Sequence, residues 1–224
     1  MELKAYISAR RVALLFVSIV LLLTLASLAG QFAKYYLGFE RAFGLINFLN
    51  VDNEGSIATW YSSAALLFCS ILLAVIAMSK MKSGAQHVVY WIALSVVFIG
   101  LSVDETISIH EKVFDSLEHS WIIPGVVVVF IFGLLFLRFL LILPKKTRYM
   151  FIIAGVVFVA GAIGFEYAAM EYWKRGYSLR SMTYAVMSTA EEFLEMIGVV
   201  IFIYALIDYM NSYAAKNIEL HIEN

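Results

Sequence analysis

Three segments of the chain place acidic side chains inside stretches that are otherwise apolar. They cover residues 102–111, 165–171 and 188–196. A carboxylate inside a membrane span costs about 2.5–3.5 kcal/mol, so such groups are rare there and usually functional. Carboxylates that face one another can exchange protons or hold a metal ion, whose positive charge offsets their mutual repulsion. These three segments are therefore the candidate functional site.

In the first segment, Asp104, Ser108 and Glu111 fall within a stripe about 60° wide if the segment is helical, since each residue turns a helix by about 100°. Gly100 continues this stripe and would let a neighbouring helix approach closely. His110 lies on its flank, where it can serve as a metal ligand or a general base. Asp104 and Glu111 could instead mark the wet end of a helix that leaves the membrane.

The other two segments predict two further acidic helix faces. Glu191 and Glu192 each lie one helical turn from Glu195. Glu166 shares its face with small residues that suit close helix contact, namely Gly155, Ala162 and Ala169. All three segments lie toward the same side of the membrane, so we expect their carboxylates to meet in one half of the bilayer.

Plainer explanations compete for some of these acids. The three glutamates of the last segment could form salt bridges with Arg175 or Arg180. Asp52 and Glu54 are typical of a turn and a helix cap before the next span. They remain second-rank candidates because they lie on the same side of the membrane as the acidic segments.

Several carboxylates with one histidine and no thiolate suit a hard or borderline ion such as Fe, Mn, Zn or Ca. The Glu-x-x-His spacing of di-iron bundles is absent from the sequence. Glu192 is predicted to be a catalytic acid beside the ligands, with His110 in a double role. The predicted metal ligands are Asp104, His110, Glu111, Glu166, Glu191 and Glu195.

Composition places the chain among membrane proteins. Of its 224 residues, 62% are hydrophobic and only 15% are charged, whereas soluble domains are about 45–50% apolar and about 25% charged. The mean hydropathy is +0.87. A net charge of −1 gives no attraction to nucleic acid. Cys69 is the single cysteine, which excludes an internal disulfide and a cysteine-based zinc site.

Six apolar runs are long enough to cross a hydrocarbon layer of about 30 Å, which takes about 20 residues. We predict an all-α bundle of six transmembrane helices in a single domain covering residues 1–224. Although the first run could pass for a signal peptide, we expect a retained anchor. The predicted spans are 12–32, 57–78, 88–113, 125–143, 150–172 and 182–209.

The charges predict the orientation of the spans. Short tails and loops that are rich in Lys and Arg stay in the cytoplasm, and ten of the sixteen cations fall on one side of the six-span topology. All but four of the seventeen acids fall in the other half. We therefore expect both termini in the cytoplasm and the acidic site in the outer half of the membrane.

Several short motifs together resemble a group of polytopic bacterial inner-membrane proteins. They are NVDNE at 50–54, TWYSS at 59–63, SVDE at 102–105, IHE at 109–111 and EExxEM at 191–196. The resemblance covers most of the chain from the second span onward. It implies a six-helix fold with a shared polar site, and it implies no particular reaction. Membrane hydrolases of the alkaline ceramidase type, which bury Asp and His around zinc, are a more distant resemblance, because they use three histidines that have no matching set here.

The sequence thus predicts a metal-dependent enzyme of the bacterial inner membrane that acts on a lipid-like or small apolar substrate. Membrane lipids are the expected partners, and no nucleic-acid partner is expected. Other membrane subunits are a further option. A proton- or cation-coupled carrier is the first alternative, since the same acids could bind and release ions. An accessory subunit, whose acids satisfy a cationic helix of a partner, is the second.

Overall fold

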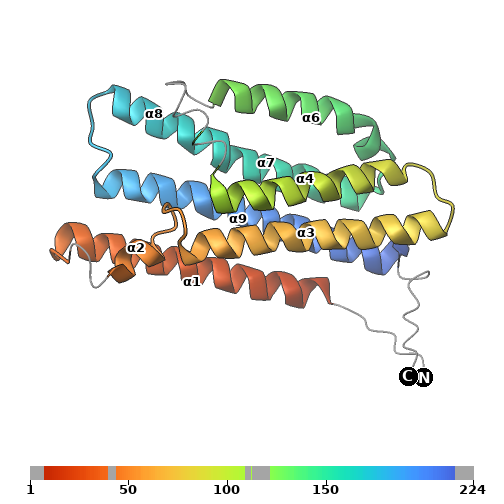
Figure 1. Cartoon of the computed structure of the whole chain (residues 1–224), viewed down its shortest axis with the longest axis horizontal. Coiled ribbons are helices and arrows are strands. Elements are labelled where there is room, and N and C mark those ends of the chain that lie inside the picture. The colour runs from red at the N-terminus through yellow and green to blue at the C-terminus, as the bar shows by residue number, and fades with distance from the viewer. Residues whose placement is uncertain (1–7, 40–43, 109–111, 113–121, 215–224) are drawn as a thin grey trace.

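The structure is a computed structural model that describes residues 8–39, 44–108, 112 and 122–214. Helices make up all the regular secondary structure in these ranges, which confirms the all-α fold (Figure 1). The elements are α1 Ala9–Tyr36, α2 Leu45–Leu49, α3 Ile57–Lys82, α4 Val88–Ile107, α6 Ile122–Ile142, α7 Lys145–Val159, the π-helix η2 Ala160–Phe165, α8 Glu166–Lys174, α9 Met182–Tyr209 and the π-helix η3 Met210–Ala214.

Three of the long helices begin at a serine that the sequence places just before an apolar run. The side-chain oxygens of Ser8, Ser56 and Ser181 accept hydrogen bonds from backbone N–H groups three residues ahead, at 3.4, 3.2 and 3.2 Å. Each bond satisfies one of the N–H groups that a helix leaves without a partner at its start. The starts of α1, α3 and α9 are therefore set by local sequence.

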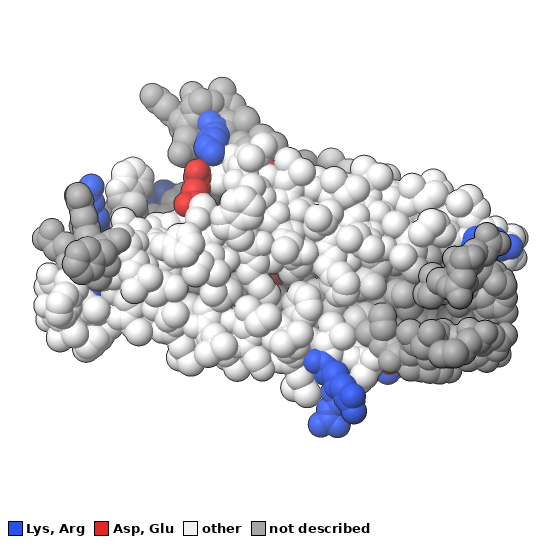
Figure 2. Space-filling model, turned by 60° about the horizontal axis from the view of Figure 1, so that its bottom comes forward, with Lys and Arg blue, Asp and Glu red and all other residues white. Residues whose placement is uncertain are grey.

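Six helical stretches are long and apolar enough to cross a membrane, with α7, η2 and α8 forming one of them. They lie lengthwise beside one another, and the described part of the face seen in Figure 2 is mostly uncharged. The protein is therefore a multi-pass membrane protein. We call the end with the α3–α4 and α6–α7 turns the basic end, because Lys80, Lys82, Lys145 and Lys146 lie there. We call the end with α2 and α8 the chamber end, because a cavity lies there.

Helices α3 and α9 form the centre of the bundle. More than half of the apolar window of each is buried, whereas α1 and α6 lie at the periphery with little of theirs buried. Cys69 and Leu73 of α3 and Ile203 and Leu206 of α9 have no exposed surface. Helix α4 packs on α3, and α1 and α7 pack on α9. The acidic residues of α9 come directly before its most buried stretch, residues 196–209.

Two reciprocal serine pairs join α3 to α4. The hydroxyls of Ser70 and Ser95 each donate to the other's backbone carbonyl, at 2.9 and 3.0 Å. Two helical turns closer to the chamber end, Ser63 and Ser102 repeat the pattern at 2.8 and 2.9 Å. Thr106 donates to the Ser63 hydroxyl at 2.9 Å. Such small residues let two helix backbones come close, and here they fix the end of α4 that carries Asp104.

We expect Ser95→Ala to lower the free energy of unfolding by about 0.6 kcal/mol, and by no more than about 1.7 kcal/mol, the range found for hydrogen bonds between membrane helices. Ser18→Ala is the matched control, because the Ser18 hydroxyl bonds only within its own helix, to the Leu14 carbonyl. Reversible unfolding in mixed micelles measures both. If Ser18→Ala lost as much stability as Ser95→Ala, the Ser70–Ser95 pair would not stabilise the contact between α3 and α4.

Helix α4 is shorter than the sequence predicts. It ends at Ile107, and Ser108 adopts a left-handed conformation with φ 46°. The expected continuation of this span to residue 113 is therefore wrong at Ser108. A left-handed residue cannot continue a right-handed helix. The stripe that was to join Asp104 and Ser108 to Glu111 on one helix consequently stops at Ser108.

Candidate functional site

A cavity of about 1000 Å³ lies at the chamber end of the bundle, and we call it the chamber. Its lining comes from the α2–α3 loop and from α3, α4, α6, α7, η2, α8 and α9, together with Ser108 and Leu179 just outside the helices. Eight acidic residues are part of this lining: Asp52, Glu54, Asp104, Glu105, Glu166, Glu191, Glu192 and Glu195. The three acidic segments predicted from the sequence therefore do meet in space.

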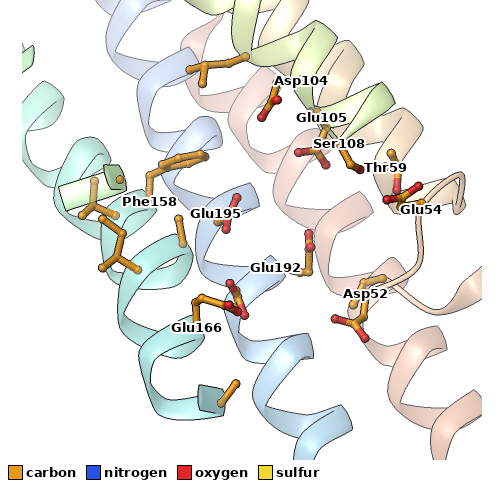
Figure 3. Close-up of a pocket in the computed structure, with 18 of the residues that line it drawn as sticks. Asp52, Glu54, Thr59, Asp104, Glu105, Ser108, Phe158, Glu166, Glu192 and Glu195 are labelled. Carbon is orange, nitrogen blue, oxygen red and sulfur yellow. The ribbon is translucent and has the colours of Figure 1, made fainter. Parts of the chain in front are cut away.

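Helix α9 supplies three of these acids from one turn. Figure 3 shows Glu192 and Glu195 directed into the space between the helices, with Glu166 reaching toward α9 from α8. All three side chains are half-buried. Glu192 lies within electrostatic range of Glu195, Glu105, Glu191 and Asp52. Glu192 is therefore the acid of α9 that lies close to acids on other elements, namely Glu105 of α4 and Asp52 of the α2–α3 loop.

The last turn of α4 forms the wall of the chamber across from the acids of α9. Asp104 and Glu105 are half-buried and Ser108 is buried, and all three line the chamber (Figure 3). Glu105 is not among the site residues predicted from the sequence, because it lies about 100° around the helix from Asp104. Both acids nevertheless line the chamber. The sequence signal that could have identified Glu105 is its place directly beside Asp104 at the end of an apolar span.

The α2–α3 loop brings Asp52 and Glu54, the two second-rank candidates, to the chamber. Asp52 and Glu54 line the chamber and are exposed. The loop is held against α1, where the Val51 N–H donates to the Ser27 hydroxyl at 3.2 Å. The hydroxyl of Thr59 fixes its other end by donating to the Asn53 carbonyl at 3.1 Å. A cap does precede α3, but the capping residue is Ser56 and not Asp52 or Glu54, and the loop is in addition part of the chamber.

Two predicted residues, His110 and Glu111, lie outside the described residues. Lys112, the next residue along the chain, is described. Its ammonium group lies 3.3 Å from a carboxylate oxygen of Glu54 and donates to the Ile107 carbonyl at 2.7 Å. Glu171, which is not a predicted site residue, is absent from the lining and pairs with Lys174 at 3.2 Å.

Close packing between η2 and α9 sets the position of the acids on α9. A methyl group added at Gly161 would lie 2.8 Å from the Glu191 carbonyl oxygen and 3.0 Å from Cγ of Glu195. At Gly198 it would lie 2.9 Å from the Ala154 carbonyl oxygen and from two atoms of Phe158. Only glycine fits at these two contacts, so the helices meet almost backbone to backbone.

Two other glycines do not have the contacts that the sequence suggests. Added methyl groups at Gly100 and Gly155 would meet no atom within 4 Å. A regular helix would place Gly155 on the face of Glu166, but the π-helix η2 lies between them. A π turn holds more residues than an α turn, so it rotates the residues after it relative to those before it. Glu166 therefore faces the chamber while Gly155 faces outward.

One wall of the chamber is apolar. It combines Leu101 of α4 and Phe158 of α7 with the first turns of α6, where Pro124, Val128 and Val129 line the space. The described lining contains no Lys, Arg or His. The chamber is thus amphipathic, with a carboxylate side and an apolar side.

The side chains in the lining that could bind a metal ion do so through oxygen atoms. Carboxylate and hydroxyl oxygens suit hard cations such as Ca²⁺, Mg²⁺ and Mn²⁺. Among the described residues, no three His, Cys, Asp or Glu side chains form a group that could hold a metal ion as they stand. A bound ion would therefore need several of these side chains to turn toward one another, or donors from outside the described ranges.

Fold and chamber together define a multi-pass, all-helical membrane protein with an acidic cavity at one end. Residues 13–209 match the family described as a domain of unknown function, DUF8692, and the chain belongs to this family. No curated protein and no solved structure matches the chain. The function is therefore argued from the chamber itself.

Proposed function

We propose that the protein is a cation-dependent membrane enzyme that acts on an amphiphilic substrate inside the chamber. One observation carries the proposal. Eight acidic residues from four segments line a single cavity whose described lining contains no basic residue. Six of them are half-buried, where repulsion between like charges is strong because water screens it poorly. A bound cation would relieve this repulsion, and this supports the proposal.

In this proposal, Glu166, Glu191 and Glu195 hold a divalent ion together with Asp104 from the facing helix. His110 and Glu111 would complete the set of ligands. When bound, the ion polarises an oxygen of the substrate or activates a water molecule. Glu192 exchanges a proton with the reacting group, since it lies among the other acids and its oxygens face the cavity (Figure 3).

The membrane side is also part of the proposal. The cations at the basic end, including Lys80, Lys82, Lys145 and Lys146, lie in tight turns or next to them. By the positive-inside rule this end faces the cytoplasm. The chamber then opens toward the outer half of a bacterial inner membrane, where lipids are its partners.

A cation-coupled carrier is a second candidate, and η2 is the observation that favours it. The fifth span is interrupted by a π-helix at the level of the chamber, where Gly161 and Ala162 lie. Carriers commonly bind ions beside interrupted helices, and π-helical turns are frequent at functional sites. Ion-driven flux into proteoliposomes, in the absence of any turnover of added lipid, would favour the carrier.

Metal analysis of the purified full-length chain tests the proposal. We expect close to one divalent ion per chain after loading with Mn²⁺, Fe²⁺, Zn²⁺ or Ca²⁺ and desalting. Glu166→Gln and Glu195→Gln should each weaken binding by about 10-fold or more, because each removes a charged ligand of the ion. Elemental analysis and equilibrium dialysis provide the two readouts.

Glu171→Gln is the matched control for Glu166→Gln. It lies on the same helix, loses the same charge and is absent from the chamber lining. It should bind the metal like the wild type. Absence of any bound metal in the wild type, or equal loss in all three variants, would contradict the metal-dependent enzyme.

A further inference from the structure

Helices α4 and α6 are joined at the basic end and separate toward the chamber end. Tyr90 and Trp91 of α4 contact the ring of Phe139 of α6 with centroid distances of 5.2 and 5.0 Å. Phe136 adds a third ring contact to Tyr90 at 5.8 Å. Further along, the main packing partners of α6 are α7 and η2 (Figure 1). The chamber begins where α4 and α6 part.

The residues that line the chamber on this side are also exposed on the surface of the bundle. Val128 is 65% exposed and Val129 is 39% exposed, although both belong to the lining. Leu101 on the facing side of α4 is 36% exposed. A closed wall would bury these side chains. The chamber is therefore open to the side between the chamber-end turns of α4 and α6, on a surface that lipid chains would surround in a membrane.

The charges of the chamber decide which head group can follow an apolar chain through this opening. A phosphate or carboxylate would meet eight acidic residues and no basic residue among the described lining. One divalent ion offsets two of these charges, and the Lys112 ammonium group pairs with Glu54 at 3.3 Å. A positively charged head group would be attracted by the remainder, and the exposed ring of Trp173 in the lining offers a further contact for a cation. A cavity of about 1000 Å³ also exceeds what a metal ion alone occupies, since it is at the upper end for small-molecule sites.

We infer that the chamber takes an amphiphile with a cationic head group, which enters from the lipid through the α4–α6 opening with its chain along Val128 and Val129. This inference rests on the proposed function, and it names the class of substrate. The positive charge lies among Glu192, Glu105 and Asp52, on the side of the chamber away from Glu166.

Native mass spectrometry of the full-length chain, released from non-ionic detergent, tests this assignment. The probes are decyltrimethylammonium and decyl phosphate, which share a chain and differ in head-group charge. We expect a single adduct of the cationic probe, with at least about tenfold higher affinity than the phosphate probe. The double variant Asp52→Asn/Glu105→Gln should remove most of this preference, and it should leave the metal content unchanged because neither residue is among the proposed ligands.

Val128→Trp and Val127→Trp test the opening. The two valines are adjacent on α6 and both exposed, but only Val128 lines the chamber. Val128→Trp should lower the affinity for the cationic probe at least about fivefold, while Val127→Trp should leave it unchanged. Equal affinities for the two probes in the wild type, or equal effects of the two tryptophans, would overturn the inference.

The metal content of the same preparations separates this inference from the proposed function. Bound metal without a preference for the cationic probe overturns the inference alone. A preference for the cationic probe without bound metal supports the inference and contradicts the metal-dependent enzyme.

Discussion

Replacing Gly161 by alanine is expected to disable the chamber while the protein remains folded. The new methyl group would lie 2.8 Å from the Glu191 carbonyl oxygen, 3.0 Å from Cγ of Glu195 and 3.1 Å from Cβ of Leu194. Two of these neighbours are a backbone oxygen and a Cβ atom, which cannot swing away as the end of a flexible side chain can. Helix η2 must therefore move away from α9, and this shifts the α9 carboxylates relative to Glu166.

We expect Gly161→Ala to weaken metal and cationic-probe binding by about tenfold or more, because ligand geometry displaced by a fraction of an ångström loses much of its affinity. Overpacking of this kind also costs about 1–3 kcal/mol of stability. Dialysis and unfolding in micelles measure the two effects separately.

Gly164→Ala is the control within the same π-helix. A methyl group there would meet no atom within 4 Å, so binding and stability should stay close to those of the wild type. If Gly161→Ala bound metal and probe normally, the packing of η2 on α9 would not position the carboxylates. The proposed role of the chamber in metal binding would still be tested by the glutamate variants.

The second large effect is expected for Gly198→Ala, at the contact between α7 and α9. The added methyl group would lie 2.9 Å from the Ala154 carbonyl oxygen, from the Phe158 backbone nitrogen and from Cβ of Phe158. All three are atoms that move only with the helix backbone. We expect the free energy of unfolding to fall by about 1–3 kcal/mol, the usual cost of inserting a methyl group into a well-packed core.

For Gly155→Ala, which lies on α7 of the same helix pair, we expect no loss of stability. Gly155 is exposed, and an added methyl group would meet no atom within 4 Å. Alanine favours a helix over glycine by up to about 1 kcal/mol, so this variant should be unchanged or slightly more stable. Unfolding curves of the two variants side by side provide the measurement. A Gly198→Ala protein as stable as Gly155→Ala would show that α7 and α9 can separate without cost.

Much of the chamber was predictable from the sequence, because burial of charge in a membrane is costly wherever it occurs. Glu166, Glu191, Glu192 and Glu195 were found from their position inside apolar runs, and all four line one cavity. Asp104 was found in the same way. Their roles as ligands or proton carriers remain predictions, and His110 and Glu111 lie outside the described residues.

Other members of the chamber depended on contacts between distant parts of the chain. Asp52 and Glu54 sit in a loop whose local pattern is that of a turn, and hydrogen bonds to Ser27 and Thr59 hold that loop in place. Glu105 lines the chamber although it lies about 100° around the helix from Asp104. No local feature marks the end of α4 at Ile107, since a left-handed serine such as Ser108 is unfavourable by itself.

The sequence by itself determined the class of protein, the number of spans and the gathering of the acids at one end of the bundle. Hydropathy and charge are properties of each residue and its near neighbours, and a membrane acts on each span separately, so these features can be read in one dimension. The tertiary structure decided the rotation of each helix, the end of α4 and the π-helix that turns Glu166 inward and Gly155 outward. These depend on how closely two backbones can pack, as at Gly161 and Gly198, and only the partner helix determines that distance.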